Sequence, residues 1–217
     1  MAVRPIGVPL EWRAWLMRHY WNAPVPPPAA AVAAVAATQP LSSLCEGLPI
    51  YQFWTLESVA ALASWIQGQG LKRVVEVGAG DGSLSRWLRP LLPGVSVIAT
   101  DSGSWRSIHP LASVERCDAR LAPRAYDADG VLSSWMPYEV DWTPAWRRTP
   151  SVRAYVLIGE GPFGCVGREE AWERPLGWTV ADVPGFEAGA WCRTDYRVST
   201  HSVAWAFLRE EEAPSCV

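Results

Sequence analysis

The sequence predicts an α/β fold whose sheet is doubly wound and mostly parallel. Short apolar runs rich in β-branched residues alternate with helix-like segments between about residues 55 and 160, which is typical of βαβ units. A glycine-rich turn directly follows the first of these runs, as in sheets that bind nucleotide-type ligands. The 217 residues, 49% of them hydrophobic, suffice for one well-buried domain and little more.

Residues 1–54 predict an N-terminal extension, helical and rich in proline and alanine, ahead of a domain at 55–217. Residues 10–22 have apolar positions at helical spacing, and the prolines at 24–28 stop that helix. The alanine-rich run Ala29–Ala37 predicts a second helix. One interpretation of this extension is a lid over a binding site, and the alternative is that it only packs on one face of the sheet.

Three further helices are predicted within the domain. Thr55–Gly68 precedes the first strand, with Thr55 as a plausible N-cap and Gly68 or Gly70 as a stop. Ser83–Leu92 follows the glycine turn, and Trp142–Arg147 follows the fourth strand. The free N–H groups at the start of Ser83–Leu92 are expected to point back at the turn.

The turn after the first predicted strand, Val74–Val77, is the most informative motif. Glycines at alternate positions allow a sharp turn and leave no Cβ between the backbone and a ligand. An acid stands two residues before the first glycine, and a carboxylate there suits a ligand with an ammonium group rather than a pyrophosphate. The candidate ligand-binding residues of this motif are Glu76, Gly78, Gly80 and Gly82.

This spacing resembles the first motif of the class I S-adenosylmethionine (SAM) dependent methyltransferases, which have a Rossmann-like fold. In that family the acid lies near the methionine moiety of the cofactor and the glycine loop lies under it. The resemblance covers residues 71–208 and implies SAM as the cofactor. It also implies a seven-stranded sheet closed by a C-terminal antiparallel pair, with the segments 178–183 and 198–208 as candidates.

Two later acids match the family's order. Asp101 ends the second predicted strand, where a carboxylate can accept hydrogen bonds from both ribose hydroxyls; alternatively it caps the turn that follows. Asp118 and Ala119 follow the third strand, where members of the family often have an acid and a small residue that contact the adenine amino group of the cofactor. Asp118 alternatively caps a helix, and the two roles are compatible.

The turn after the fourth strand is where the family usually places its methyl acceptor. Ser134 is expected to contact the cofactor, and Trp135 and Tyr138 the substrate, together with His19 from the predicted lid. Relatives that methylate nucleobase amino groups often carry Asn/Asp-Pro-Pro-aromatic here. This chain has Ser134-Trp135-Met136-Pro137-Tyr138 instead, and the difference argues against a flipped base as substrate. Most of the 14 tryptophans are expected in the core, and a few can form an aromatic box for a cation or a flat substrate.

Methyl transfer from a sulfonium is an in-line displacement. The protein must align the acceptor, exclude water and, for some acceptors, remove a proton. The candidate bases are Glu139 and Glu160, each just past a predicted strand end, and Tyr20 from the lid. Glu139 alternatively stabilises the first turn of the helix that follows.

The composition excludes several other classes. A net charge of −3 with scattered basic residues disfavours non-specific binding to nucleic acid. The 5 cysteines are widely separated and the 3 histidines lie far apart, so no metal site and no disulfide framework are expected. A reduced, cytoplasmic setting without membrane insertion is the expectation. The oligomeric state stays open.

Three functions fit these observations. The first is SAM-dependent methyl transfer to a small-molecule acceptor. The second is methylation of a protein or RNA, with residues 1–54 reading the substrate. The third is a catalytically silent SAM-fold protein that serves as a binding or scaffold subunit. The intact glycine motif and Asp101 disfavour the third, because a silent relative would often lose them.

Overall fold

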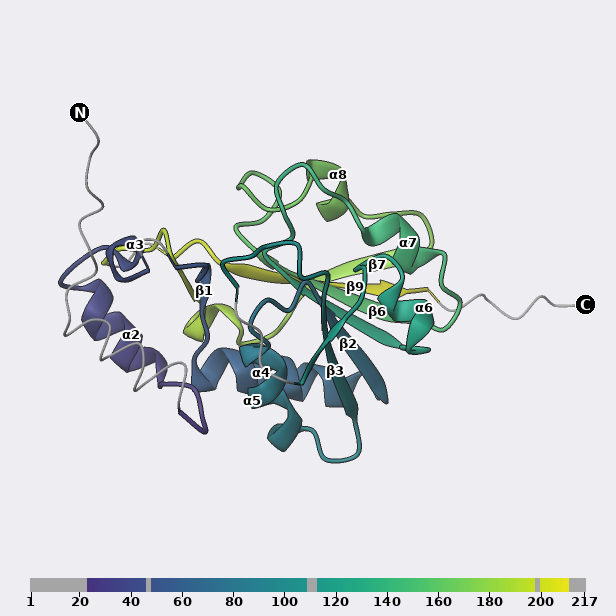
Figure 1. Ribbon diagram of the computed structural model, residues 1–217, viewed down its shortest axis with the longest axis horizontal. Helices are drawn as coiled ribbons and strands as arrows, with labels where there is room; N and C mark the ends of the chain where they lie inside the picture. The colour runs from purple at the N-terminus through teal and green to yellow at the C-terminus, as the bar shows by residue number, and fades with distance from the viewer. Residues whose placement is uncertain (1–22, 46–47, 109–112, 198–199, 211–217) are drawn as a thin grey trace, which may run out of the picture.

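The centre of the molecule is a seven-stranded sheet. The computed structural model describes residues 23–45, 48–108, 113–197 and 200–210. The strand order is β4–β3–β2–β5–β6–β9–β7, and Figure 1 shows helices on both faces. The strands are β2 (Arg73–Val77), β3 (Ser96–Asp101), β4 (Val114–Arg116), β5 (Gly130–Ser134), β6 (Ala154–Gly159), β7 (Trp178–Asp182) and β9 (Val203–Arg209).

The first five strands in this sheet pair in parallel, while β9 pairs antiparallel with both β6 and β7. The predicted mostly parallel sheet with a C-terminal antiparallel pair is therefore confirmed. The chain order reverses next to β2, which lies between β3 and β5. Open α/β sheets bind their ligands in the crevice that opens outside the carboxyl ends of the strands at such a reversal.

Two hydrophobic cores lie on opposite faces of the sheet. Val74 of β2 belongs to one cluster, and Val75 and Val77 belong to the other. This division follows from the alternation of side chains along a strand. The helices that follow or precede the strands are α4 (Leu56–Gly68), α5 (Ser83–Leu91), α6 (Ala122–Ala125), α7 (Thr143–Arg147) and α8 (Glu169–Trp172).

Most of the described tryptophans are buried, as expected for residues with so much apolar area. On one face, Tyr155 stacks on Phe207 with ring centroids 4.5 Å apart, and Trp146 and Trp178 pack around Tyr155. The Trp146 indole donates a 2.8 Å hydrogen bond to the carbonyl of Ala119. This ring therefore fixes the segment after β4 as well as filling the core.

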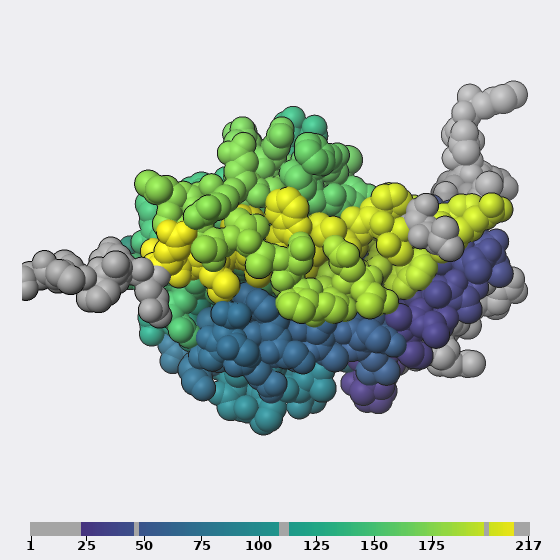
Figure 2. All heavy atoms as spheres, turned by 180° about the vertical axis from the view of Figure 1, so that it is seen from behind, coloured from purple at the N-terminus to yellow at the C-terminus, as the bar shows by residue number. Residues whose placement is uncertain are grey.

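The described part of the extension shares the core of the domain. Its elements are α2 (Ala29–Ala36), α3 (Leu41–Leu44) and β1 (Gln52–Phe53), and β1 pairs antiparallel with β8 (Trp191–Cys192). Buried residues of α2 and α3 belong to the same cluster as those of α4. Figure 2 shows the purple segment that contains α2 and α3 beside the yellow-green segment around residue 195, where the Leu41 N–H donates to the carbonyl of Asp195.

Several elements differ from the sequence prediction in extent. The helix predicted at residues 10–22 lies outside the described residues. The predicted helix Ala29–Ala37 is confirmed to within one residue as α2. The two-residue strands β1 and β8 and the short helices α3, α6 and α8 were not predicted. No helix in the described part of the chain has the length and apolar character to cross a membrane.

The N-terminus of α4 is fixed by a buried capping box. Thr55 and Ser58 exchange side-chain and backbone hydrogen bonds, and the Thr55 hydroxyl also donates to the carbonyl of Gly189 at 2.7 Å. Because Thr55 and Ser58 are both fully buried, water cannot replace these partners.

We expect Thr55→Ala to lower the free energy of unfolding by about 1–2 kcal/mol, the usual cost of losing an N-cap. Thr55→Ser keeps the hydroxyl and should lose much less. Urea denaturation followed by circular dichroism measures both variants. Equal stability of Thr55→Ala and wild type would contradict a stabilising cap.

Candidate functional site

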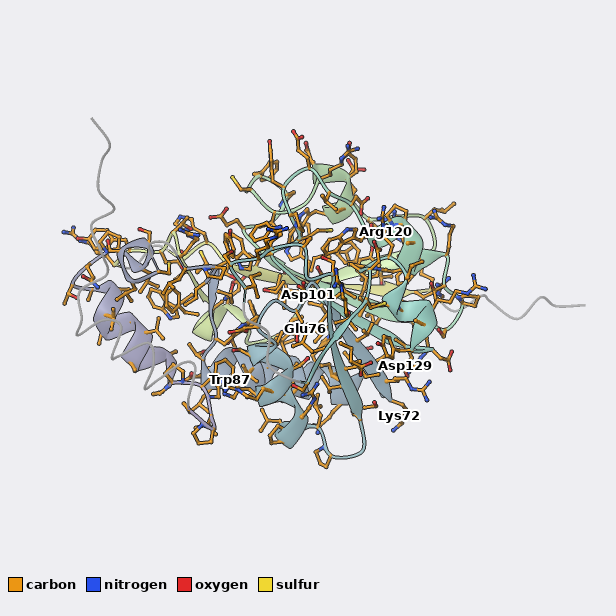
Figure 3. The ribbon with its side chains drawn as sticks, viewed as in Figure 1. Lys72, Glu76, Trp87, Asp101, Arg120 and Asp129 are labelled. Atoms are coloured by element: carbon orange, nitrogen blue, oxygen red, sulfur yellow. The ribbon has the colours of Figure 1, made fainter. Side chains whose placement is uncertain are left out.

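A cavity of about 910 Å³ opens at the carboxyl edge of the sheet, where the order of the strands reverses. Residues that follow β2, β3, β4 and β5 line one side of it, and residues 48–52 with Trp54 line another. In Figure 3, Glu76 and Asp101 lie close together near this edge, whereas Lys72 and Asp129 lie at the opposite end of the strands. Pockets of this size accommodate small molecules and cofactors.

Glu76 is the buried acid of the cavity, with 3% of its surface exposed. Its Oε2 accepts hydrogen bonds from the backbone N–H and the hydroxyl of Ser85, at 3.1 Å and 2.5 Å. Burial raises the pKa of Glu76 to about 7, and the nearby negative charge of Asp81 adds to the effect. A cationic group beside this carboxylate would favour its ionised form.

Several N–H groups around the glycine turn are already used within the protein. The N–H groups of Ser83 and Ser85, in the first turn of α5, donate to the carboxylates of Asp81 and Glu76. Those of Ala79 and Gly80 donate to the carbonyl of Thr100 and the carboxylate of Asp101. A phosphate site needs such donors directed at the ligand and disfavours acids beside them. The turn therefore suits a ligand with a positive group, as its sequence predicted.

Asp101 joins the glycine turn to the end of β3. Its Oδ2 accepts from the Gly80 N–H at 3.0 Å, and its Oδ1 accepts from the Gly103 N–H at 2.7 Å. The contact with Gly103 supports the turn-capping alternative. A carboxylate has about four acceptor positions, so the oxygens can still accept from ligand hydroxyls on the cavity side. The two roles predicted for Asp101 are compatible in this geometry.

Asp118, Ala119 and Ser134 also line the cavity, as predicted for cofactor contacts. The guanidinium of Arg120 binds both carboxylate oxygens of Asp118, at 3.1 Å and 3.0 Å, and its backbone N–H donates at 2.8 Å. These hydrogen bonds hold the pKa of Asp118 below its usual value. The predicted helix cap is wrong, because the N-cap of α6 is Leu121 and no side chain caps that helix, whereas the Asp118 carboxylate is held by Arg120 within its own turn. The adenine contact stays a prediction.

Of the three motif glycines, Gly78 and Gly80 line the cavity and Gly82 is not among its lining residues. All three have positive φ. A Cβ on Gly82 would lie 2.4 Å from a methyl of Val114, whereas one on Gly80 would meet its nearest atom, in Ile108, only at 3.9 Å. Gly82 therefore allows the start of α5 to pack on β4, and Gly80 leaves the space above the turn open.

The other half of the cavity wall is aromatic. The Tyr51 ring lies 5.5 Å from the Trp135 ring at 31°, and 6.2 Å from the Trp105 ring at 64°. The Trp135 indole donates a 3.0 Å hydrogen bond to the amide oxygen of Gln52. The predicted substrate residues Trp135 and Tyr138 both line this wall. Tyr51 and Gln52 were missed, because nothing in the local sequence marks a segment that is joined to the sheet only by tertiary contacts.

The candidate bases are not placed together at the cavity. Glu139 and Glu160 do not line it. Both oxygens of Glu160 are engaged, one accepting from the Thr194 hydroxyl at 2.7 Å and the other from the Cys165 N–H at 3.3 Å. Tyr20 and His19 lie outside the described residues. The catalytic roles of Glu139, Glu160 and Tyr20 stay predictions.

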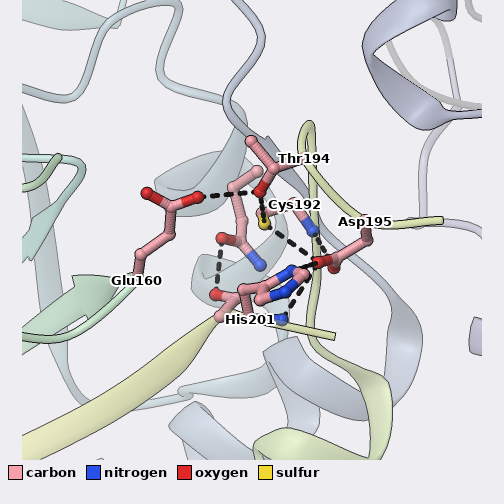
Figure 4. A network of polar contacts seen from close by, with 7 residues as sticks. Glu160, Cys192, Thr194, Asp195 and His201 are labelled. Atoms are coloured by element: carbon pink, nitrogen blue, oxygen red, sulfur yellow. Dashed lines mark hydrogen bonds and ion pairs between the residues drawn. The ribbon is translucent and has the colours of Figure 1, made fainter. Parts of the chain in front are cut away.

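Beside the aromatic wall lies a polar cluster around Asp195, shown in Figure 4. The buried Asp195 carboxylate accepts from the backbone N–H groups of Cys192 and His201, and contacts Cys192 Sγ at 3.3 Å and His201 Nδ1 at 2.7 Å. The side chains of Cys192, Asp195 and His201 are close enough to hold a metal ion. Burial raises the pKa of Cys192 to about 12, so its thiol stays protonated. The Asp195 carboxylate, by accepting the two backbone N–H groups, caps the loop between β8 and β9.

Comparisons with known proteins bear on the fold alone. No family model and no curated protein matches the chain. Solved structures similar to it include the S-adenosylmethionine-dependent methyltransferase SibL, with 14% identity, TM-score 0.46 and coverage of 93% of this chain and 73% of that one. Human N-acetylserotonin methyltransferase in complex with SAM has 9% identity, TM-score 0.44 and coverage of 79% and 55%. The match to the CurJ carbon methyltransferase has 14% identity, TM-score 0.42 and coverage of 64% of this chain, and spans about half (49%) of that protein.

Glu76 makes the stability of the protein depend on pH. The folded protein keeps a proton on Glu76 up to a pKa of about 7, whereas the unfolded chain releases it near the ordinary pKa of 4.5. The contribution of Glu76 to stability therefore falls as the pH rises from about 4.5 to about 7, because its side chain binds fewer protons in the unfolded state than in the folded state in this window.

We expect Glu76→Gln to remove this contribution, which amounts to roughly 3 kcal/mol by pH 8. Denaturation midpoints measured between pH 4 and pH 8 test this, with the exposed Glu173→Gln as the control that keeps the wild-type profile. Parallel profiles for Glu76→Gln and wild type would show that the carboxylate titrates normally.

Proposed function

We propose that this protein is a SAM-dependent methyltransferase that acts on a small molecule. The observation that carries the proposal is the cavity wall after β2, β3 and β4, where Glu76, the glycine turn, Asp101 and Asp118 face one space in the order that the sequence resemblance implies. The residues present fit the cofactor. Glu76 is a buried acid with a raised pKa, which a neighbouring cation would lower, and Gly80 leaves the space above the turn open.

Each residue has a defined task in this proposal. Glu76 holds the ammonium group of the cofactor, and Asp101 accepts hydrogen bonds from the ribose hydroxyls. Asp118, Ala119 and Ser134 border the adenine. When bound, the cofactor supplies an activated methyl group on a sulfonium. The protein orients the acceptor in line with that group and excludes water, and this alignment accounts for much of the rate gain in such displacements.

The character of the acceptor wall favours a small molecule over a protein or RNA. An extended polymer groove would carry basic residues to meet backbone charges or phosphates. Among the described residues that line the cavity, Arg86 is the one basic side chain, and it belongs to α5 on the cofactor side. A silent scaffold role is disfavoured because the glycine turn, Glu76 and Asp101 keep a geometry fitted to a ligand.

We also propose that the N-terminal extension closes the acceptor site. Residues 48–52 with Trp54 line the cavity, and β1 anchors them to β8. This segment supplies a wall that the sheet and its helices alone do not provide. Closure of this kind excludes water from the reacting groups.

Gly80→Arg should abolish binding of SAM and S-adenosylhomocysteine, because its side chain enters the open space above the turn. The matched control is Gly70→Arg, which has a similar positive φ (62° against 58°) and open surroundings but lies outside the cavity. Calorimetry should detect no binding to the first variant and near-normal binding to the second. Wild-type-like binding by Gly80→Arg would refute the assignment of the cofactor to this turn.

Cofactor affinity should rise with pH through about 7, because the ammonium group favours the ionised form of Glu76. Titrations with S-adenosylhomocysteine at pH 6 and pH 8 measure the change, which we expect to be several-fold. Glu76→Gln should bind more weakly at pH 8 and lose most of the dependence. If the affinity of Glu76→Gln for S-adenosylhomocysteine changed with pH as in the wild type, another group would be responsible for the pH dependence.

A further inference from the structure

The cavity wall is divided by charge. The charged residues among its described lining are Glu76, Asp81, Arg86, Asp101 and Asp118, and each lies near the end of β2 or β3, just after β2 or β4, or in α5. The remaining wall, between residues 48–54, Trp105 and the turn after β5, has aromatic, aliphatic and uncharged polar side chains. A charged molecule there would lose its hydration without gaining a counter-ion.

The aromatic side chains of this wall are held in place before any ligand binds. Trp135 has a left-handed backbone conformation (φ 56°), and its N–H donates to the carbonyl of Ile158 at 2.8 Å. Its indole N–H is used by Gln52, whose amide oxygen also accepts from the Ser202 hydroxyl at 2.8 Å. With its single donor occupied, the Trp135 ring offers the cavity only apolar and π surface.

A cation is a poor occupant for this wall. The Arg193 guanidinium lies 5.1 Å from the centroid of the Tyr51 ring and already makes a cation–π contact with it. Its positive charge is close enough to oppose a second cation on the Tyr51–Trp135 pair. A flat, uncharged ring can stack on the same side chains without this opposition, since aromatic pairs prefer offset or edge arrangements.

The described part of the same wall has little capacity to remove a proton. The described residues of the aromatic side include no histidine, lysine or carboxylate, and their titratable groups are the phenols of Tyr51 and Tyr138 and the thiol of Cys165. A phenol or alcohol acceptor needs a base, whereas a neutral nitrogen with a free lone pair does not. The acceptor atom favoured by this wall is therefore an uncharged nitrogen.

We propose that the aromatic wall binds a planar, uncharged nitrogen heteroaromatic ring or arylamine, whose nitrogen receives the methyl group. This inference rests on the proposed function. The nitrogen lone pair forms the new bond to the methyl carbon, and the electron pair of the broken carbon–sulfur bond stays on the sulfur, which becomes a neutral thioether. A ring nitrogen keeps the positive charge, and an arylamine releases its extra proton to water.

Three probes of known chemistry test the proposal at pH 8 on wild-type protein. Quinoline is flat, neutral and has a ring nitrogen; 1-naphthol has a similar shape with a hydroxyl; tetramethylammonium is a cation. Binding is measured by calorimetry on protein saturated with S-adenosylhomocysteine, and transfer by mass spectrometry after incubation with SAM. Quinoline and 1-naphthol should both bind, tetramethylammonium should not, and only quinoline should gain a methyl group.

Trp135→Leu should weaken quinoline binding about tenfold, the loss of roughly one aromatic pair, while S-adenosylhomocysteine binding is unchanged. Trp135→Phe keeps a ring and should stay within a few-fold of wild type, which separates stacking from misfolding. Trp205→Leu changes a half-buried tryptophan outside the cavity and is the matched control.

The outcomes separate this inference from the proposed function. Tight binding of S-adenosylhomocysteine with no binding of either flat probe, or with binding of tetramethylammonium, overturns the inference and leaves the methyltransferase proposal intact. Methylation of 1-naphthol overturns the assignment of nitrogen as the acceptor atom. Absence of S-adenosylhomocysteine binding to the wild type defeats the proposed function itself and the inference with it.

Discussion

The burial of one carboxylate, that of Glu76, is the constraint on which the site depends. It lies between the end of β2 and the first turn of α5, and Ser85 supplies its hydrogen bonds. A buried carboxylate without a fully compensating cation destabilises the fold, and such groups are commonly found at functional sites. Together with Asp81 it uses up helix donors that would otherwise attract an anion. The rest of the site follows from this choice of charge.

Much of the fold could be predicted, because local patterns agree with the tertiary structure. The apolar runs of β2, β3, β5 and β6 are buried strands whose length and composition identify them without neighbours. The N-cap at Thr55 is equally local. The cofactor side of the cavity was accessible for the same reason, since its residues all stand at the carboxyl ends of strands, and parallel strands bring those ends to one edge.

On the acceptor side, Trp135 and Tyr138 follow β5 and were predicted, but the wall built from residues 48–52 could not be predicted in the same way. Tyr51 and Gln52 reach the cavity because a two-residue strand pairs with Trp191 and Cys192, and such a short pairing leaves no periodic pattern. Asp118 shows a second limit: its spacing was recognised, but the bidentate contact with Arg120 depends on side-chain geometry that spacing does not encode. Glu160 faces Thr194 for a similar reason, since β6 and the loop after β8 meet only in the folded protein.

The hydrogen bond between Ser202 and Gln52 spans 150 residues of the chain. During synthesis, the cofactor side, from β2 to β5, is complete by about residue 134, whereas the acceptor wall lacks its support until β9 has been made. Contacts of such long sequence separation form late because the closure of the intervening loop must come first. A chain that ends before Ser202 therefore contains the glycine turn but lacks the hydrogen bond that holds Gln52, the partner of the Trp135 indole. By this order, the wall proposed to recognise the acceptor is the last part of the cavity to be completed.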